Sequence, residues 1–376
     1  MTKPLSSLRR GYIEGYYGRL LDWPGRHALL DVLEQHAMNG YFYAPKEDPA
    51  HRFRWRQDWD QEWWQGFRDF TAAARHKGIT VIGGIAPGLD FDFASLASGA
   101  GDAAILIAKA ERLIDNGARE ISLLMDDLDP GFHGRDGGYA SEGLAHADLA
   151  NHLADRISVP LSVTPRIYAD DIDDPGEAYL SDFCARLDPG LMVWTCGSHI
   201  VAPAIDLTAT RLARQGVAPE RMLIWDNLYA HDYCPRRLFL GPWRGRTKAG
   251  HIFLNPTGMP LTDALLLALM AAGDDEDAWQ KSLRAHDVPE AFFTVAAFFD
   301  RPPDPAAPLP DDLFDPARAG DWLDSLDTLL WRWKSPLQRE WYPFLMGLRG
   351  DLLYRTGAMD SLRRHKVFPP LITPGD

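Results

Sequence analysis

The amino-acid sequence predicts an α/β protein, a (β/α)8 TIM barrel followed by a C-terminal helical appendage. Two observations lead to this prediction. Eight short apolar runs alternate along the chain with longer amphipathic segments, which is typical of repeated βα units. The alternation ends near residue 270, and about 250 residues is the usual length of a closed barrel of eight such units.

The eight predicted strands are short and end in polar residues or turns. They cover residues 11–15, 40–46, 80–87, 121–127, 161–165, 191–195, 222–227 and 251–255. Uninterrupted apolar runs are typical of parallel strands that are buried on both faces. An open doubly wound sheet ranks second, because the Gly15-Tyr-Tyr-Gly18 turn after the first run lacks the GxGxxG pattern of a phosphate-binding loop.

Apolar residues at helical spacing predict the helices. Those between the strands include residues 24–38, 61–77 and 104–116, and those beyond the barrel cover residues 275–300 and 318–358. Because proline lacks the N–H of the helix ladder, we expect Pro336 and Pro343 to kink or divide the last segment. The predicted domains are therefore a barrel over residues 1–270 and a helical region over 271–376, with a Pro-rich linker near 301–310.

The composition narrows the classes of partner. The net charge of −14 disfavours nucleic acid and anionic membranes as partners. The three cysteines form no CxxC pattern, and we expect no disulfide framework, no metal and no cofactor. The first ten residues lack the apolar stretch of a signal peptide, and no apolar run approaches the ~20 residues of a membrane helix, so we expect a soluble, cytoplasmic protein.

Two adjacent acids, Asp126 and Asp127, stand where the fourth predicted strand stops. Active sites in parallel α/β folds lie just beyond the carboxyl ends of the strands. Neighbouring carboxylates repel each other, so we expect the pKa of one to rise and that of the other to fall, as general acid chemistry beside an ionised carboxylate requires. The alternative is that the pair caps a helix or solvates a turn.

If the eight strands close into a barrel, their polar ends meet at one face. The set expected there comprises Glu14, Lys46, Asp126, Asp127, Tyr168, Trp194, Trp225, Asn227, Asp232 and Asn255. Carboxylates, amides, aromatic rings and one cation suit an uncharged, hydroxyl-rich ligand such as a sugar. Alternatives stay open for single members. Lys46 could pair with Glu47 or Asp48, Asn255-Pro256 could simply end a strand, and both tryptophans could belong to the core.

Adjacent carboxylates do not straddle a glycosidic bond, as the two acids of most glycosidases do at a separation of ~5 Å or more. A mechanism without a protein nucleophile fits the pair better. In that mechanism the 2-acetamido oxygen of the sugar attacks its own anomeric carbon. One Asp holds the amide N–H, and the next protonates the leaving oxygen.

Six motifs follow one another in a consistent order from about residue 9 to 275. They are Gly11-Tyr-Ile-Glu-Gly-Tyr-Tyr-Gly18, Tyr43-Ala-Pro-Lys-Glu-Asp48, Ala86-Pro-Gly-Leu-Asp90, Leu124-Met-Asp-Asp-Leu-Asp129, Trp225-Asp-Asn-Leu-Tyr-Ala-His-Asp-Tyr233 with Arg237-Leu-Phe-Leu-Gly-Pro242, and Leu254-Asn-Pro256. Together they resemble glycoside hydrolase family 84, the family of O-GlcNAcases and related β-N-acetylglucosaminidases, in its bacterial single-domain form.

The resemblance implies a retaining hydrolase that cleaves terminal β-linked GlcNAc, on Ser or Thr of glycoproteins, through an oxazoline intermediate. By motif, Asp126 would orient the acetamido group and Asp127 would be the general acid and then the base. Sugar hydroxyls would be bound by Gly15, through its backbone, and by Lys46, Asp232 and Asn255, and the acetamido group would be enclosed by Tyr168, Trp225 and Asn227. The resemblance also makes a homodimer through the C-terminal helices an expectation.

Two motifs depart from the family pattern. Pro165-Arg-Ile-Tyr168 replaces the usual Pro-Thr-Glu-Tyr, and Trp194-Thr-Cys-Gly197 replaces Trp-Thr-Gly-Pro. Both changes concern the leaving-group side, which leaves open whether the acceptor is a glycopeptide or a glycan, including hyaluronan-type fragments. Two further readings remain: a catalytically inactive GlcNAc-binding protein on a degenerate barrel, and a metal-dependent enzyme that uses Asp126, Asp127 and Asp129.

Overall fold

The computed structural model describes residues 8–132, 134–246, 248–302, 309 and 311–357. The chain forms two compact units, which are described separately. The barrel unit comprises Met1–Asn227 and Gly245–Gly258, and the helical unit comprises Leu228–Arg244 and Met259–Asp376. The domain boundary expected at residue 270 stays a prediction.

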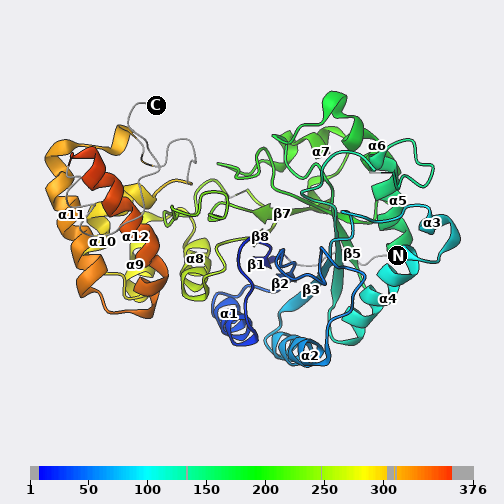
Figure 1. Cartoon of the computed structure of the whole chain (residues 1–376), viewed down its shortest axis with the longest axis horizontal. Helices are drawn as coiled ribbons and strands as arrows, with labels where there is room; N and C mark the ends of the chain where they lie inside the picture. The colour runs from blue at the N-terminus through cyan, green and yellow to red at the C-terminus, as the bar shows by residue number, and fades with distance from the viewer. Residues whose placement is uncertain (1–7, 133, 247, 303–308, 310, 358–376) are drawn as a thin grey trace. The chain divides into compact units, whose positions relative to one another are not determined.

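The barrel unit contains a closed parallel barrel, in which β1 pairs with both β2 and β8 (Figure 1). The strands are β1 Arg10–Glu14, β2 Gly40–Tyr43, β3 Thr80–Ile85, β4 Glu120–Leu124, β5 Leu161–Thr164, β6 Met192–Thr195, β7 Met222–Asp226 and β8 His251–Leu254. All eight lie where apolar runs predicted them, because each run is short enough for one strand and is followed by a turn. The predicted fold class is confirmed.

Helices cover the outside of the barrel between successive strands (Figure 1). They are α1 Trp23–Gln35, α2 Gln61–His76, α3 Ser95–Ser98, α4 Asp102–Asp115, α5 Glu142–Ala154, α6 Ala178–Arg186 and α7 Arg211–Arg214. Side-chain caps fix several of their starts. Asp22 accepts a hydrogen bond from Gly25 N at the start of α1, and Asp60 accepts one from Trp63 N at the start of α2.

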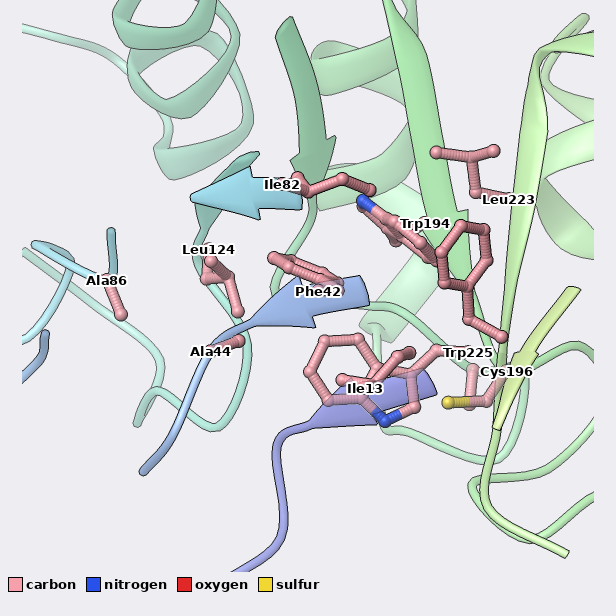
Figure 2. Packing of buried hydrophobic residues seen from close by; sticks show 12 residues of the cluster. Ile13, Phe42, Ala44, Ile82, Ala86, Leu124, Trp194, Cys196, Leu223 and Trp225 are labelled. Atoms are coloured by element: carbon pink, nitrogen blue, oxygen red, sulfur yellow. The ribbon is translucent and has the colours of Figure 1, made fainter. Parts of the chain in front are cut away.

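Large aromatic side chains fill the inside of the barrel (Figure 2). Trp194 stacks on Phe42 with 4.9 Å between ring centroids and meets Phe253 edge-on. Its Nε1 donates to Ser162 Oγ at 2.9 Å, so the one polar group of this ring is satisfied. Trp194 is therefore a core residue, as the alternative reading allowed. A Cβ on Gly40 would lie 2.3 Å from Phe253, so glycine leaves the room that this ring needs.

Glu14 does not join the barrel mouth, and that expectation is wrong. Its carboxylate is fully buried in the wall, where Arg26 of α1 donates to both oxygens and Tyr41 donates to Oε2 at 2.8 Å. Successive residues of a strand point to opposite faces. The side chain of Ile13 belongs to the inner cluster, so that of Glu14 points outward to the helix layer.

The helical unit consists of α8 Pro260–Ala272, α9 Glu276–Ala285, α10 Ala291–Val295, a 3₁₀ turn Ala296–Phe299, α11 Ala319–Asp327, a π turn Thr328–Arg332 and α12 Pro336–Arg355. The two helical segments predicted beyond the barrel are thus confirmed. The predicted linker near 301–310 lies largely outside the described residues. No helix in the described part of the chain is long and apolar enough to cross a membrane.

Of the two prolines expected to interrupt the last segment, only Pro336 does so, because it begins α12. Pro343 lies inside α12 and does not divide it, so that part of the expectation is wrong, while a kink at Pro343 stays a prediction. Two residues near it, Trp341 and Phe344, are buried in the helical unit and are 1% and 3% exposed. Tertiary packing of these large side chains outweighs the helix hydrogen bond that a proline removes.

Candidate active site

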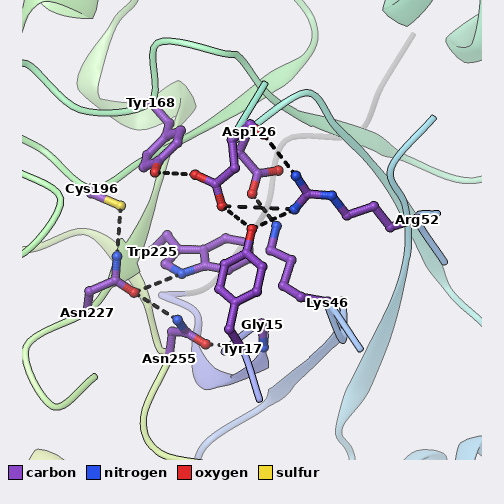
Figure 3. Close-up of polar contacts among 11 residues, drawn as sticks. Gly15, Tyr17, Lys46, Arg52, Asp126, Tyr168, Cys196, Trp225, Asn227 and Asn255 are labelled. Carbon is purple, nitrogen blue, oxygen red and sulfur yellow. Dashed lines mark hydrogen bonds and ion pairs between the residues drawn. The ribbon is translucent and has the colours of Figure 1, made fainter. Parts of the chain in front are cut away.

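The carboxyl-end loops of the barrel unit bring the expected polar side chains together around Asp126 and Asp127 (Figure 3). The two acids follow β4 after one intervening residue, Met125. Asp127 has a φ of 53°, a conformation that Asp adopts more readily than most residues. This backbone turn separates the neighbouring side chains, so each carboxylate has its own set of partners.

Asp126 is paired with Lys46, which lies in the loop after β2. The side chains are 7% and 2% exposed, so both charges are almost completely removed from solvent. The alternative pairing of Lys46 with Glu47 or Asp48 is wrong. Asp126 uses Oδ2 for the lysine, while its Oδ1 is buried and has no hydrogen-bond partner among the described residues. A buried acceptor without a partner is costly, which points to a donor supplied by a ligand.

Asp127 accepts hydrogen bonds on both carboxylate oxygens. The Tyr17 hydroxyl donates to Oδ2 and the Tyr168 hydroxyl donates to Oδ1, each at 2.6 Å. Burial alone would raise the pKa of Asp127, but the nearby Lys46 charge and the two tyrosine hydroxyls outweigh burial and hold that pKa below its usual value. In the free protein Asp127 is therefore ionised, so the lowered pKa belongs to the residue that the resemblance made the general acid.

Below the acids, Trp225 forms a floor that Gly15 makes possible. A Cβ on Gly15 would lie 2.3 Å from the indole ring, so the ring packs directly on the backbone of the loop after β1. The indole Nε1 donates to Asn227 Oδ1 at 3.1 Å. The Lys46 ammonium lies 5.5 Å from the centre of the ring, within cation–π range.

An amide chain joins the ends of β7 and β8 to β1. Asn255 donates from Nδ2 to Asn227 Oδ1 at 2.9 Å and accepts from Gly15 N at 3.1 Å. Asn227 in turn donates to Ile200 O and to the sulfur of Cys196 in the loop after β6. These bonds fix both amides, and with them the orientation of the backbone around Gly15.

The structure thus brings eight of the predicted residues into one cluster: Gly15, Lys46, Asp126, Asp127, Tyr168, Trp225, Asn227 and Asn255. Asp232 lies in the segment Leu228–Arg244 of the helical unit, and its sugar contact stays a prediction. No group of three or more His, Cys, Asp or Glu side chains within the described ranges could hold a metal ion.

Sequence reasoning missed the roles of Tyr17, Arg52 and Cys196. Tyr17 stands in the same turn as Gly15, directly after β1, and that position was a usable signal. Arg52 lies six positions after Lys46, and nothing in the spacing marks it as reaching Asp127. Cys196 was noted only as a departure from a motif, whereas the structure puts its thiol against Asn227.

A parallel barrel that presents two adjacent carboxylates, an ion-paired lysine, tyrosine hydroxyls and an aromatic floor defines a glycosidase-type site. The family comparison agrees with this class. The model described as beta-N-acetylglucosaminidase matches residues 10–283, and the chain belongs to this family of glycoside hydrolases.

Named relatives point in the same direction. The chain is 30% identical over 243 residues to the Protein O-GlcNAcase of Rattus norvegicus and equally to that of Mus musculus. The matched region is 63% of this chain but only 26% of each relative, so the chain spans about a quarter of their length. A structure described as an O-GlcNAc hydrolase mutant from Thermobaculum terrenum superposes with a TM-score of 0.72 at 20% identity, over 95% of this chain and 89% of that one, which is a likeness of fold.

Proposed function

We propose that this protein is a retaining β-N-acetylglucosaminidase that removes terminal β-linked GlcNAc from Ser or Thr of glycoproteins by substrate-assisted catalysis. One observation carries the proposal. Asp126 is held by Lys46 on one oxygen while its other oxygen is buried and lacks a partner within the described residues. An acetamido N–H supplies the donor that this oxygen lacks, and the hydrogen bond makes the acetamido oxygen a better nucleophile.

In the first step, the acetamido oxygen attacks the anomeric carbon as the bond to the leaving oxygen breaks. Asp127, in its protonated form, gives its proton to that oxygen, so the acceptor leaves as a neutral alcohol. The products are a protonated oxazoline (an oxazolinium ion), whose N–H stays hydrogen-bonded to Asp126, and the ionised Asp127. The Asp126 carboxylate, which is paired with Lys46, stabilises the positive charge that develops on the acetamido group.

In the second step, Asp127 takes a proton from water, and the resulting hydroxide opens the oxazoline at the anomeric carbon. Two inversions at that carbon give net retention. The low pKa of Asp127 in the free protein matches an ionised base, and the substrate must displace part of the Tyr17 and Tyr168 contacts before Asp127 can act as an acid.

Glycoproteins are the proposed acceptors because both named relatives are protein O-GlcNAcases. A glycan acceptor and an inactive GlcNAc-binding protein are the alternatives that the experiment must separate. The homodimer through the C-terminal helices and the cytoplasmic location stay predictions.

The decisive experiment measures release of 4-methylumbelliferone from its β-GlcNAc glycoside by wild type and Asp126→Asn, with EDTA present. Turnover by wild type and its loss in Asp126→Asn, at equal melting temperature, is the expected result. A folded wild type that binds GlcNAc without turnover would establish the binding protein instead. Turnover that EDTA abolishes would favour the metal-dependent enzyme.

A second comparison separates the roles of the two acids. Asp127→Ala should lose about 10²- to 10⁴-fold in kcat on a glycopeptide, whose alkoxide leaves poorly without a proton, and far less on an aryl glycoside. Asp126→Ala should damage both substrates, since the nucleophile itself loses its partner. Equal losses on both substrates in the two variants would contradict this assignment.

A further inference from the structure

Arg52 reaches the catalytic pair from the loop after β2, although it is six residues from Lys46. Its guanidinium is buried, with 6% of the side chain exposed. One nitrogen, Nη1, donates to the Tyr17 hydroxyl at 2.7 Å, and the other, Nη2, donates to the main-chain oxygen of Asp127 at 2.9 Å. Nη1 also lies 4.0 Å from Asp127 Oδ2 (Figure 3).

The direction of these hydrogen bonds follows from the chemistry of arginine. A guanidinium has donors and no acceptor, so the Tyr17 oxygen must accept from Arg52. The hydroxyl has a single hydrogen, and the geometry directs it to Asp127 Oδ2 at 2.6 Å. Without Arg52 the hydroxyl could turn and accept from another donor.

The second contact acts on the backbone. Asp127 has a φ of 53°, which a side-chain-bearing residue adopts only at some cost in conformational energy. The bond from Arg52 Nη2 to the Asp127 carbonyl holds the peptide in the orientation that goes with this φ. The same guanidinium therefore fixes both the backbone and one carboxylate oxygen of the residue.

We propose that Arg52 is a positioning residue which, through the Tyr17 hydroxyl and the Asp127 carbonyl, sets the orientation in which Asp127 meets the leaving oxygen. This inference rests on the proposed function, because it assumes that Asp127 is the acid and base. The role requires a planar guanidinium group whose two nitrogens donate to two acceptors at once. Lysine has one compact ammonium group and cannot replace it.

The electrostatic consequence can be worked out from the groups that face Asp127 in the barrel unit. They are Asp126, Lys46, Tyr17, Arg52, Tyr168 and Cys196. The Arg52 charge and the Tyr17 hydrogen bond both lower the pKa of Asp127, whereas burial raises that pKa. Removing Arg52 takes away the charge and weakens the hydrogen bond, but the carboxyl group stays buried. The pKa of Asp127 therefore rises in the variant.

The experiment compares kcat against pH for wild type, Arg52→Met and Arg54→Met on an aryl β-GlcNAc glycoside and a GlcNAc peptide, because kcat reports the protonation of Asp127 in the complex with substrate. Arg54 is exposed on the same loop and serves as the matched control. The kcat of Arg52→Met on the peptide should fall about tenfold or more. The alkaline limb of its pH profile, which reports protonated Asp127, should move up by about one pH unit. Arg54→Met should match wild type. Arg52→Lys should return the alkaline limb part of the way to its wild-type pH, but should not restore kcat.

Tyr17→Phe provides a second test if Arg52→Met does not fold, since it deletes only the hydroxyl between the two residues. It should shift the alkaline limb in the same direction. An unmoved limb in a folded Arg52 variant, or the same loss in Arg54→Met, would overturn the proposal. Titration of the Asp127 carboxyl by ¹³C NMR in wild type and Arg52→Met needs no turnover, so it tests the positioning role even if wild type proves inactive.

Discussion

Gly15→Ala should damage both stability and activity, because one methyl group enters the floor of the site. The added Cβ would lie 2.3 Å from Trp225 Cζ2, whereas ordinary contact begins at 3.4 Å. The ring or the β1 loop must therefore yield by roughly 1 Å, and overpacking of this kind costs about 1–3 kcal/mol of unfolding free energy. Since Trp225 is hydrogen-bonded to Asn227 and lies near Lys46, the shift reaches the Asp126–Asp127 pair. A misplacement of about 1 Å costs on the order of 10²-fold in kcat/KM.

The measurements are the urea midpoint and kcat/KM on the methylumbelliferyl glycoside, for wild type, Gly15→Ala and Gly250→Ala. Gly250 is a matched control in the barrel unit, because a Cβ there meets nothing within 4 Å. Gly250→Ala should be close to wild type in both assays. If Gly15→Ala retains wild-type stability and activity, the reasoning that Trp225 and Gly15 form a rigid floor is refuted.

Two further predictions concern the barrel unit. Arg246→Met should lower the unfolding free energy by roughly 3–5 kcal/mol in urea denaturation. The side chains of Arg246 and Asp226 are 0% and 1% exposed, so the carboxylate would stay buried without its cation. A loss below about 1 kcal/mol would contradict a buried ion pair. His51 and His146 have pKa values lowered from 6.5 to about 3, chiefly by burial. The unfolded chain therefore binds these protons first, and stability present above pH 6.5 should fall by about 1.4 kcal/mol per pH unit for each histidine as the pH drops toward 3. Urea unfolding at pH 7, 6 and 5 checks the slope, and a flat profile would exclude buried neutral histidines.

The barrel could be predicted from the sequence because each of its strands is specified by a short stretch of neighbouring residues. Each run, such as Leu161–Thr164, is apolar, short and bounded by turn residues, and eight of them in one chain leave few ways to bury both faces. Pro343 could not be predicted in the same way, since its place inside α12 depends on burial of Trp341 and Phe344 in a packed unit.

The site could be predicted in part, for residues at the end of a strand or within a few positions beyond it. Lys46, Asp126 and Asn255 follow β2, β4 and β8, so closing the barrel brings them to one face. Glu14 satisfied the same rule and failed, because strand alternation turns it outward to Arg26. Arg52 satisfied no such rule, since the path of a loop decides what its side chain reaches.

The sequence by itself determined the barrel, the positions of its strands and the adjacency of the two acids. These features depend on residues that are close together in the sequence, namely the apolar runs and the polar residues that end them. Only the tertiary structure decided how the acids divide their partners. Lys46 pairs with Asp126, whereas Tyr17, Tyr168 and Arg52 converge on Asp127. The physical reason is that the charge state of a carboxyl group depends on burial and on groups within a few ångströms, and loops far apart in the sequence bring those groups together.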